Sequence, residues 1–170
     1  MYNTDAPLFP EHVDNEHFHI STIVLPAFAG SQFREGPYGA LSAPGKSDGK
    51  THAVSSKVLP VKEFIQAIEW VIKHDAQIRD ALFESLVEHY EEFREYEEDK
   101  ALVPDIQSSN ELLSLSGLVA LHINSISDNG DPIFGIELGC NWDSDQGAGA
   151  SFRGLNVESA GDANHSLVSC

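Results

Sequence analysis

The chain has 170 residues, 41% of them hydrophobic, and its 27 acidic against 10 basic residues give a formal net charge of −17 at pH 7. This length and apolar content suit one globular domain that buries a core without metal or disulfide support. The strong negative charge excludes nucleic acid and anionic membrane surfaces as partners, because an acidic field repels both, and it favours a basic partner.

The compartment is inferred from the N-terminal residues and the cysteines. Residues 1–10 have neither the basic nor the apolar region of a signal peptide, and no stretch approaches the ~18 apolar residues of a membrane span. Cys140 lies in an apolar run and Cys170 is the last residue. Without a secretory signal, we expect two free thiols and a cytoplasmic location.

Residues 1–58 predict strands and a loop. Residues 18–25 are rich in β-branched and apolar side chains and end before Pro26, which predicts a strand. Residues 30–50 contain several turn dipeptides, so we expect a β-hairpin or a long loop there. Residues 51–56 then predict a second short strand.

Residues 60–99 predict a pair of amphipathic helices. After Pro60, apolar residues recur at helical spacing at Phe64, Ile65, Ile68, Val71 and Ile72. We expect Asp75 to cap a second helix, which runs to about Glu98. Its apolar stripe consists of Ile78, Leu82, Leu86, Tyr90 and Phe93.

The second predicted helix carries a dense run of acids. Residues 1–83 contain ten acids and seven bases, whereas residues 84–170 contain 17 acids and three bases. The like-charge pairs Glu84/Glu88 and Glu88/Glu92, four residues apart near a helix C-terminus, each cost roughly a few tenths of a kcal/mol. Two interpretations stay open: a solvated helix face, or an acidic surface that meets a basic partner.

Residues 117–158 predict antiparallel strands. Two strand-like runs, 118–126 and 133–142, flank Asn129-Gly130, the strongest hairpin signal in the chain. A turn over 143–149 leads to a third strand over 150–157. The predicted fold class is therefore α+β: an antiparallel sheet with two amphipathic helices packed on one face, in a single domain spanning residues 1–170.

No arrangement of residues reaches a catalytic, metal or cofactor signature. Asp143 and Asp145 have the opening spacing of a calcium loop, but Gly154 stands where that loop needs a bidentate Glu. A tight turn fits better, with Gly147 and Gly149 at positive φ and both aspartates bonded to the turn backbone. We therefore predict no catalytic residue, no metal and no cofactor.

Three motifs follow one another in the C-terminal third: Trp142-Asp143, Gly147-Ala-Gly149 and Gly161-Asp162-Ala163. Their succession, after a helical segment that begins near Gln66, resembles the end of a small family of uncharacterised bacterial domains, over about residues 60–165. In that family a Trp-Asp pair, a His-Gly-x-Gly turn and a final Gly-x-Ala recur, and Gln146 stands here in place of the histidine. Many such domains resemble immunity proteins of polymorphic or contact-dependent toxin systems. The immunity proteins of nucleases tend to be small and acidic because they cover a basic nucleic-acid site.

Charge and resemblance together favour a non-enzymatic immunity protein that binds and neutralises a cognate basic bacterial toxin, such as a nuclease. In such an interface, truncating a desolvated anchor costs ~2 kcal/mol or more, whereas rim acids mainly change the association rate. The expected contact residues are Glu88, Glu91, Glu92, Glu95, Trp142, Asp143 and Asp145.

Two other functions stay open. A self-associating structural or regulatory module, a homodimer joined through the exposed edge of the C-terminal sheet, predicts association that depends on concentration. A hydrolase with Asp143 and Asp145 as acid and base predicts an activity that Asp143→Asn abolishes.

Overall fold

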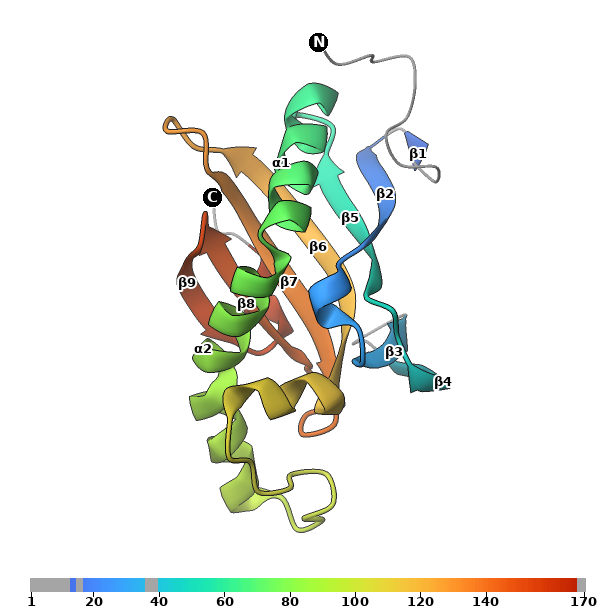
Figure 1. Ribbon diagram of the computed structural model, residues 1–170, viewed down its shortest axis with the longest axis vertical. Coiled ribbons are helices and arrows are strands. Elements are labelled where there is room, and N and C mark those ends of the chain that lie inside the picture. The colour runs from blue at the N-terminus through green and yellow to red at the C-terminus, as the bar shows by residue number, and fades with distance from the viewer. Residues whose placement is uncertain (1–12, 15–16, 36–39, 168–170) are drawn as a thin grey trace.

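The computed structural model describes residues 13–14, 17–35 and 40–167, which form an α+β fold (Figure 1). A seven-stranded sheet has the strand order β1-β2-β5-β6-β7-β8-β9, and β3 and β4 form a separate two-stranded sheet. The strands are β1 (Val13–Asp14), β2 (Phe18–Val24), β3 (Gln32–Glu35), β4 (Ala40–Lys46), β5 (Lys50–Ser56), β6 (Ser116–Ile126), β7 (Pro132–Cys140), β8 (Ala148–Arg153) and β9 (Asn156–Gly161).

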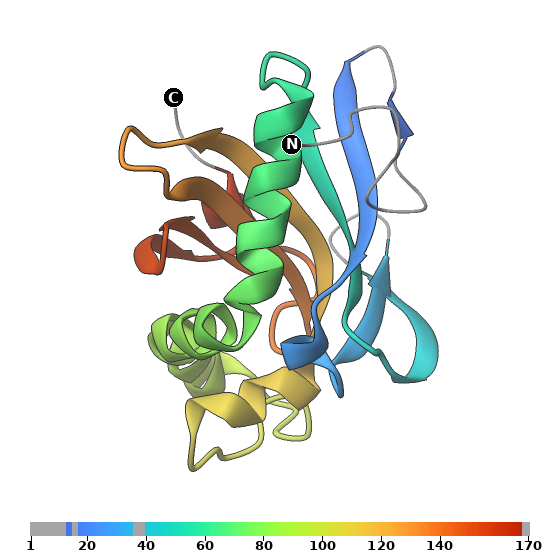
Figure 2. The same ribbon diagram turned by 45° about the horizontal axis from the view of Figure 1, so that its top comes forward.

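The described residues also form two α-helices and three short 3-10 helices, the last of which follows β9. The α-helices are α1 (Val61–Lys73) and α2 (Asp75–Tyr96), and the 3-10 helices are η1 (Pro26–Phe28), η3 (Ser109–Leu115) and η4 (Ala163–Ser166). Figure 2 shows α1 from the side and α2 nearly along its axis, so the two helices diverge at a marked angle. Helix α1 contacts β2 and β6, whereas α2 contacts β8 and β9.

The prediction of a purely antiparallel sheet is wrong, because β5 and β6 run parallel, with His52 opposite Ala120. After β5 the chain passes through both α-helices and η3 before it enters the sheet again at β6. A crossover of that length carries the chain back to the end of the sheet at which β5 began, so β6 runs in the same direction as β5. The other neighbouring strands of the sheet pair antiparallel.

The predicted third C-terminal strand is in fact two strands. Gly154 has a φ of +56°, and with Leu155 it forms the turn between β8 and β9. A Cβ at Gly154 would also lie 3.1 Å from the Asp131 carboxylate. The run over 150–157 looked continuous because a single glycine supplies the turn, and β9 becomes the edge strand of the sheet.

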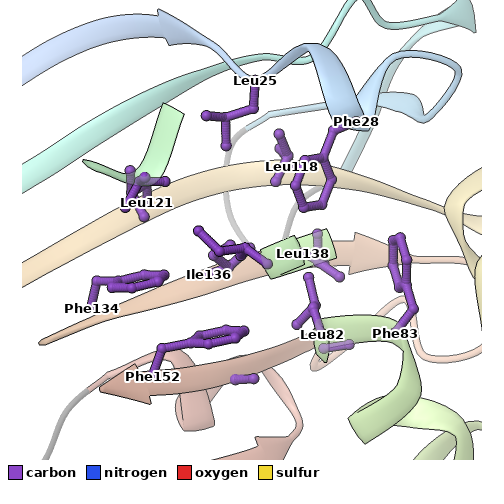
Figure 3. Packing of buried hydrophobic residues seen from close by; sticks show 14 of the residues in the cluster. Leu25, Phe28, Leu82, Phe83, Leu118, Leu121, Phe134, Ile136, Leu138 and Phe152 are labelled. Carbon is purple, nitrogen blue, oxygen red and sulfur yellow. The ribbon is translucent and has the colours of Figure 1, made fainter. Parts of the chain in front are cut away.

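The core draws its buried residues from both α-helices and from strands of the seven-stranded sheet. Phe134 of β7 stacks on Phe152 of β8 with ring centroids 4.9 Å apart (Figure 3), and Trp70 of α1 lies 6.2 Å from Phe134. The apolar stripe predicted for α2 is fully buried at Ile78, Leu82, Leu86 and Tyr90. Helical periodicity in the sequence therefore identified the buried side of α2.

Asp75 does not cap α2 as predicted. The N-cap position is occupied by His74, without a side-chain capping bond. The Asp75 carboxylate instead accepts a hydrogen bond of 2.7 Å from the backbone N–H of Ala27. Asp75 thus ties the start of α2 to η1, a contact between segments that are distant in the sequence.

Cys140 is a free, buried thiol. Burial raises its pKa to about 12, and its S–H donates to the Asp143 carbonyl over 3.5 Å. A thiol held in the protonated form is a poor nucleophile. Cys170 lies outside the described residues.

Among the described helices, none combines the length and the apolar character that crossing a membrane requires.

Candidate functional site

Helix α2 passes beside the edge strand β9 (Figure 1). A polar cavity of about 290 Å³ opens between residues of these two elements and η4. We call it the hollow. Residues of α2 form one wall, and the end of β9 with η4 forms the other. The hollow is lined by Ser85, Glu88, His89, Glu92, Ala160, Gly161, Asp162 and His165.

His89 is held in one tautomer by a buried tryptophan. The indole N–H of Trp142 donates to His89 Nδ1 over 3.2 Å. Because indole nitrogen only donates, Nδ1 must be the unprotonated ring nitrogen, and the neutral imidazole carries its proton on Nε2. Burial lowers the pKa of His89, although Asp143, Glu92 and Asp162 act in the opposite direction. The neutral, Nε2-protonated form is therefore the favoured one.

His165 carries its proton on the opposite ring nitrogen. Its Nδ1 lies 3.2 Å from the Asp162 carboxylate, which can only accept, so Nδ1 carries a proton and donates to it. Asp162 also accepts from the backbone N–H of Asn164 at the start of η4. The ring lies against Gly161, where a Cβ would stand 2.7 Å from His165 Cε1. A side chain at position 161 would therefore displace this imidazole.

The hollow is dominated by acceptors. Its lining includes the carboxylates of Glu88, Glu92 and Asp162 but neither lysine nor arginine. Glu88 and Glu92 are exposed, one helical turn apart on α2. Such a set of carboxylates is suited to an ammonium or guanidinium group, whose donors are all N–H. Within the described residues, no set of three His, Cys, Asp or Glu side chains is arranged to hold a metal ion.

Two of the predicted contact residues on α2, Glu91 and Glu95, do not line the hollow. Glu91 pairs with Arg94 at 3.0 Å, and Arg94 also lies 3.4 Å from Asp105. The hydrogen bond to Glu91 raises the pKa of Arg94. Glu95 is exposed, one turn beyond Glu91. These acids extend the acidic surface towards the end of α2, whereas Glu88 and Glu92 belong to the hollow itself.

The predicted residues at the turn after β7 lie in three different environments. Trp142 is only 2% exposed, and its ring stands edge-on to Tyr90 with centroids 5.2 Å apart. Asp143 is half-buried and accepts from the Gln146 backbone N–H at 3.0 Å, as predicted for a turn aspartate. Asp145 is exposed. Trp142 thus touches the hollow through His89 rather than through its own accessible surface.

The predicted positive φ is confirmed for Gly147, at +66°, and wrong for Gly149. Gly149 is a residue of β8 and pairs with Gly161 across the strands. Its Cβ would lie 2.9 Å from the backbone oxygen of Ile136 in β7 and 3.1 Å from Ser166 Cβ in η4. Position 149 therefore needs a glycine for close packing of β7 and η4, which is a tertiary requirement that the local sequence does not reveal.

Sequence reasoning missed His89, Asp162 and His165 as members of one site. His89 lies between two of the predicted acids, and Asp162 belongs to the Gly161-Asp162-Ala163 motif. Both positions could therefore have been recognised in the sequence as candidate site residues. Neither position showed that α2 and η4 meet, because that contact depends on β9 turning back beside the helix. Only the folded arrangement brings the three residues together.

Residues 53–167 match the domain of unknown function DUF6985. The match covers more than half of the chain and includes both α-helices, strands β6 to β9 and every residue that lines the hollow. Neither curated proteins nor solved structures gave a match. The chain belongs to the DUF6985 family of domains.

Proposed function

We propose that this protein is a non-enzymatic immunity protein that binds a cognate basic bacterial toxin and blocks it through the acidic surface around the hollow. The observation that carries the proposal is the hollow itself, lined by three carboxylates without a lysine or arginine among its residues. It lies in the half of the chain that holds 17 acids against three bases. Charge and shape therefore coincide at one place.

An arginine or lysine side chain of the partner is the group that this geometry suits. Glu88 and Glu92 offer carboxylate oxygens from one wall and Asp162 from the other, so a cation between them gains charge-assisted hydrogen bonds. Exposed acids around it, such as Glu84 and Glu95, contribute to long-range attraction. The partner's anchor thus fills the hollow, and the surrounding acids speed its approach.

A growth-rescue assay tests this proposal. The protein is co-expressed with the basic toxin domain encoded by a neighbouring gene, and survival is compared between wild type and Glu88→Arg/Glu92→Arg. We expect the double charge reversal to abolish rescue, because it places two cations where the partner's cation binds. The matched control is Glu69→Arg/Asp128→Arg, which reverses two exposed acids outside the hollow and is expected to retain rescue.

Each outcome bears on the proposal directly. Loss of rescue in the hollow variant alone supports it. Equal rescue by both double variants, with both proteins folded by circular dichroism, would contradict it. A wild-type protein that fails to bind or protect against any neighbouring basic protein would contradict it as well.

A second candidate function is self-association through β9. Within the described sheet, β9 is one of the two edge strands and pairs only with β8, so its other side is available to an added strand. The ion pair Arg153–Glu158, at 2.8 Å, places charges at this edge, which disfavours pairing. Light scattering over a concentration series tests this candidate: a dimer that Val157→Pro dissolves supports it, and a monomer throughout contradicts it.

A further inference from the structure

We propose that His89 is a proton-operated switch of the hollow: in its neutral form it accepts the Trp142 indole N–H and leaves the hollow free for a cation, and on protonation it breaks that bond and repels the cation. The inference rests on the proposed function for what the hollow binds. The switch itself rests on the geometry around His89.

The first step is the conflict between two donors. Protonation of the imidazole adds a hydrogen to Nδ1, which faces the Trp142 N–H at 3.2 Å. Two N–H donors cannot share this contact, so one ring must move. Trp142 is only 2% exposed and packs against Tyr90, whereas His89 is half-buried at the wall of the hollow. The imidazole is therefore the ring that turns.

The second step is the change of charge in the hollow. In the neutral form Nε2–H makes no hydrogen bond to a described residue and reaches solvent at the hollow. This N–H is free to bind an acceptor, such as a backbone carbonyl beside the partner's cationic side chain. In the protonated form the ring carries a positive charge among the carboxylates that would otherwise receive that side chain.

The charged groups that face His89 come from each element packed against it. Helix α2 contributes Glu88 and Glu92, the turn after β7 contributes Asp143, and the segment from β9 to η4 contributes Asp162 and His165. The carboxylates favour the protonated ring and His165 disfavours it, but desolvation is the largest effect and lowers the pKa of His89. The switch therefore operates on the acid side of the ordinary histidine range.

The sign of the linked stability change follows from this direction. Because the folded-state pKa lies below the ordinary 6.5, the unfolded chain binds this proton at a higher pH than the folded chain does. The contribution of His89 to the free energy of unfolding is thus complete above the ordinary value. It is lost progressively as the pH falls below that value towards the folded-state pKa.

Nitrogen-edited NMR of the whole protein tests the switch without a partner. At pH 7.5 we expect His89 to show a protonated Nε2 and a bare Nδ1, and on acidification we expect the Trp142 indole proton to shift with the same midpoint as His89. In His89→Gln, whose amide oxygen can still accept from Trp142, the indole shift should be independent of pH. An indole signal that titrates unchanged in His89→Gln, or does not titrate in wild type, would overturn the proposal.

Binding of hexa-arginine, measured by calorimetry at pH 7.5 and pH 5.5, tests the consequence for the hollow. We expect wild type to lose about fivefold or more in affinity on acidification, from one added cation near the site, and His89→Gln to lose clearly less. His52→Gln, which changes an exposed histidine on β5, is the matched control and should behave as wild type. Equal losses in wild type and His89→Gln would overturn the switch.

The two proposals fail in distinguishable ways. If His89 and Trp142 titrate together but hexa-arginine binds at neither pH, the switch in the structure stands and the cationic anchor of the proposed function is contradicted. If hexa-arginine binds with the same affinity at both pH values, the cationic anchor stands and the switch is contradicted.

Discussion

Helices α1 and α2 follow each other in the chain, but they differ in their content of charged residues. Helix α1 has two acids and two lysines in 13 residues, whereas α2 has seven acids and two arginines in 22. Both bury an apolar side in the core, but α2 also presents unfavourable like-charge pairs towards its C-terminus. The composition of α1 is explained by the core alone. Of the acids of α2, Glu88 and Glu92 line the hollow, and stability does not explain why these two like charges stand one helical turn apart.

The largest expected effect on the free energy of unfolding comes from a substitution in the core beneath α1. Phe134→Ala removes a fully buried ring that stacks on Phe152 and contacts Trp70, so we expect it to lower the free energy of unfolding by about 3–5 kcal/mol. Urea denaturation followed by circular dichroism measures the change. Ile133→Ala, at the neighbouring half-buried position, is the control with the smaller loss. A loss below about 1 kcal/mol in Phe134→Ala would show that this core is wrongly placed.

A smaller effect is expected where the core meets the hollow. Trp142→Phe keeps an aromatic ring but removes the N–H that holds His89, and we expect a loss of about 1–2 kcal/mol from the smaller ring and the missing hydrogen bond. His89 should then populate both neutral tautomers, which its ¹⁵N chemical shifts report. A His89 that keeps a single Nε2–H tautomer in this variant would contradict the role given to Trp142.

The smallest expected effect is a slight gain in stability rather than a loss. It distinguishes an acid of α2 from an acid of α1. Glu88→Gln removes like-charge repulsion with Glu84 and Glu92, so we expect the thermal midpoint to rise slightly, by the equivalent of about 0.2–0.5 kcal/mol. The same change should weaken binding of a basic partner. Glu69→Gln on α1 removes another exposed acid, outside the hollow, and should leave binding unchanged. A lower midpoint in Glu88→Gln would mean that Glu88 serves stability.

The local parts of the fold were predictable from the sequence. Helical periodicity located both helices, and Asn129-Gly130 marked the hairpin between β6 and β7, where Gly130 has a φ of +91°. The parallel pairing of β5 with β6 was not predictable in this way, since it joins strands separated by both helices. Hydrophobic patterns report which side of an element is buried and leave open which element covers it.

The candidate site was predictable in part for the same reason. The excess of acids on α2 pointed to Glu88 and Glu92 as surface acids. Their position opposite Asp162 and His165 depends on the Gly154 turn, which folds β9 back beside α2. Sequence reasoning also placed Trp142 in the interface, whereas its burial makes it the support of His89.

The dissociation constant of the complex with the cognate toxin, measured for three versions of the protein, tests the central claim most directly. The versions are wild type, Glu88→Arg/Glu92→Arg and Glu69→Arg/Asp128→Arg. Loss of a desolvated charged anchor costs ~2 kcal/mol or more, or roughly 30-fold in affinity, so we predict at least that loss in the hollow variant and little change in the control. Equal affinities in all three would contradict the claim that the hollow is the binding site.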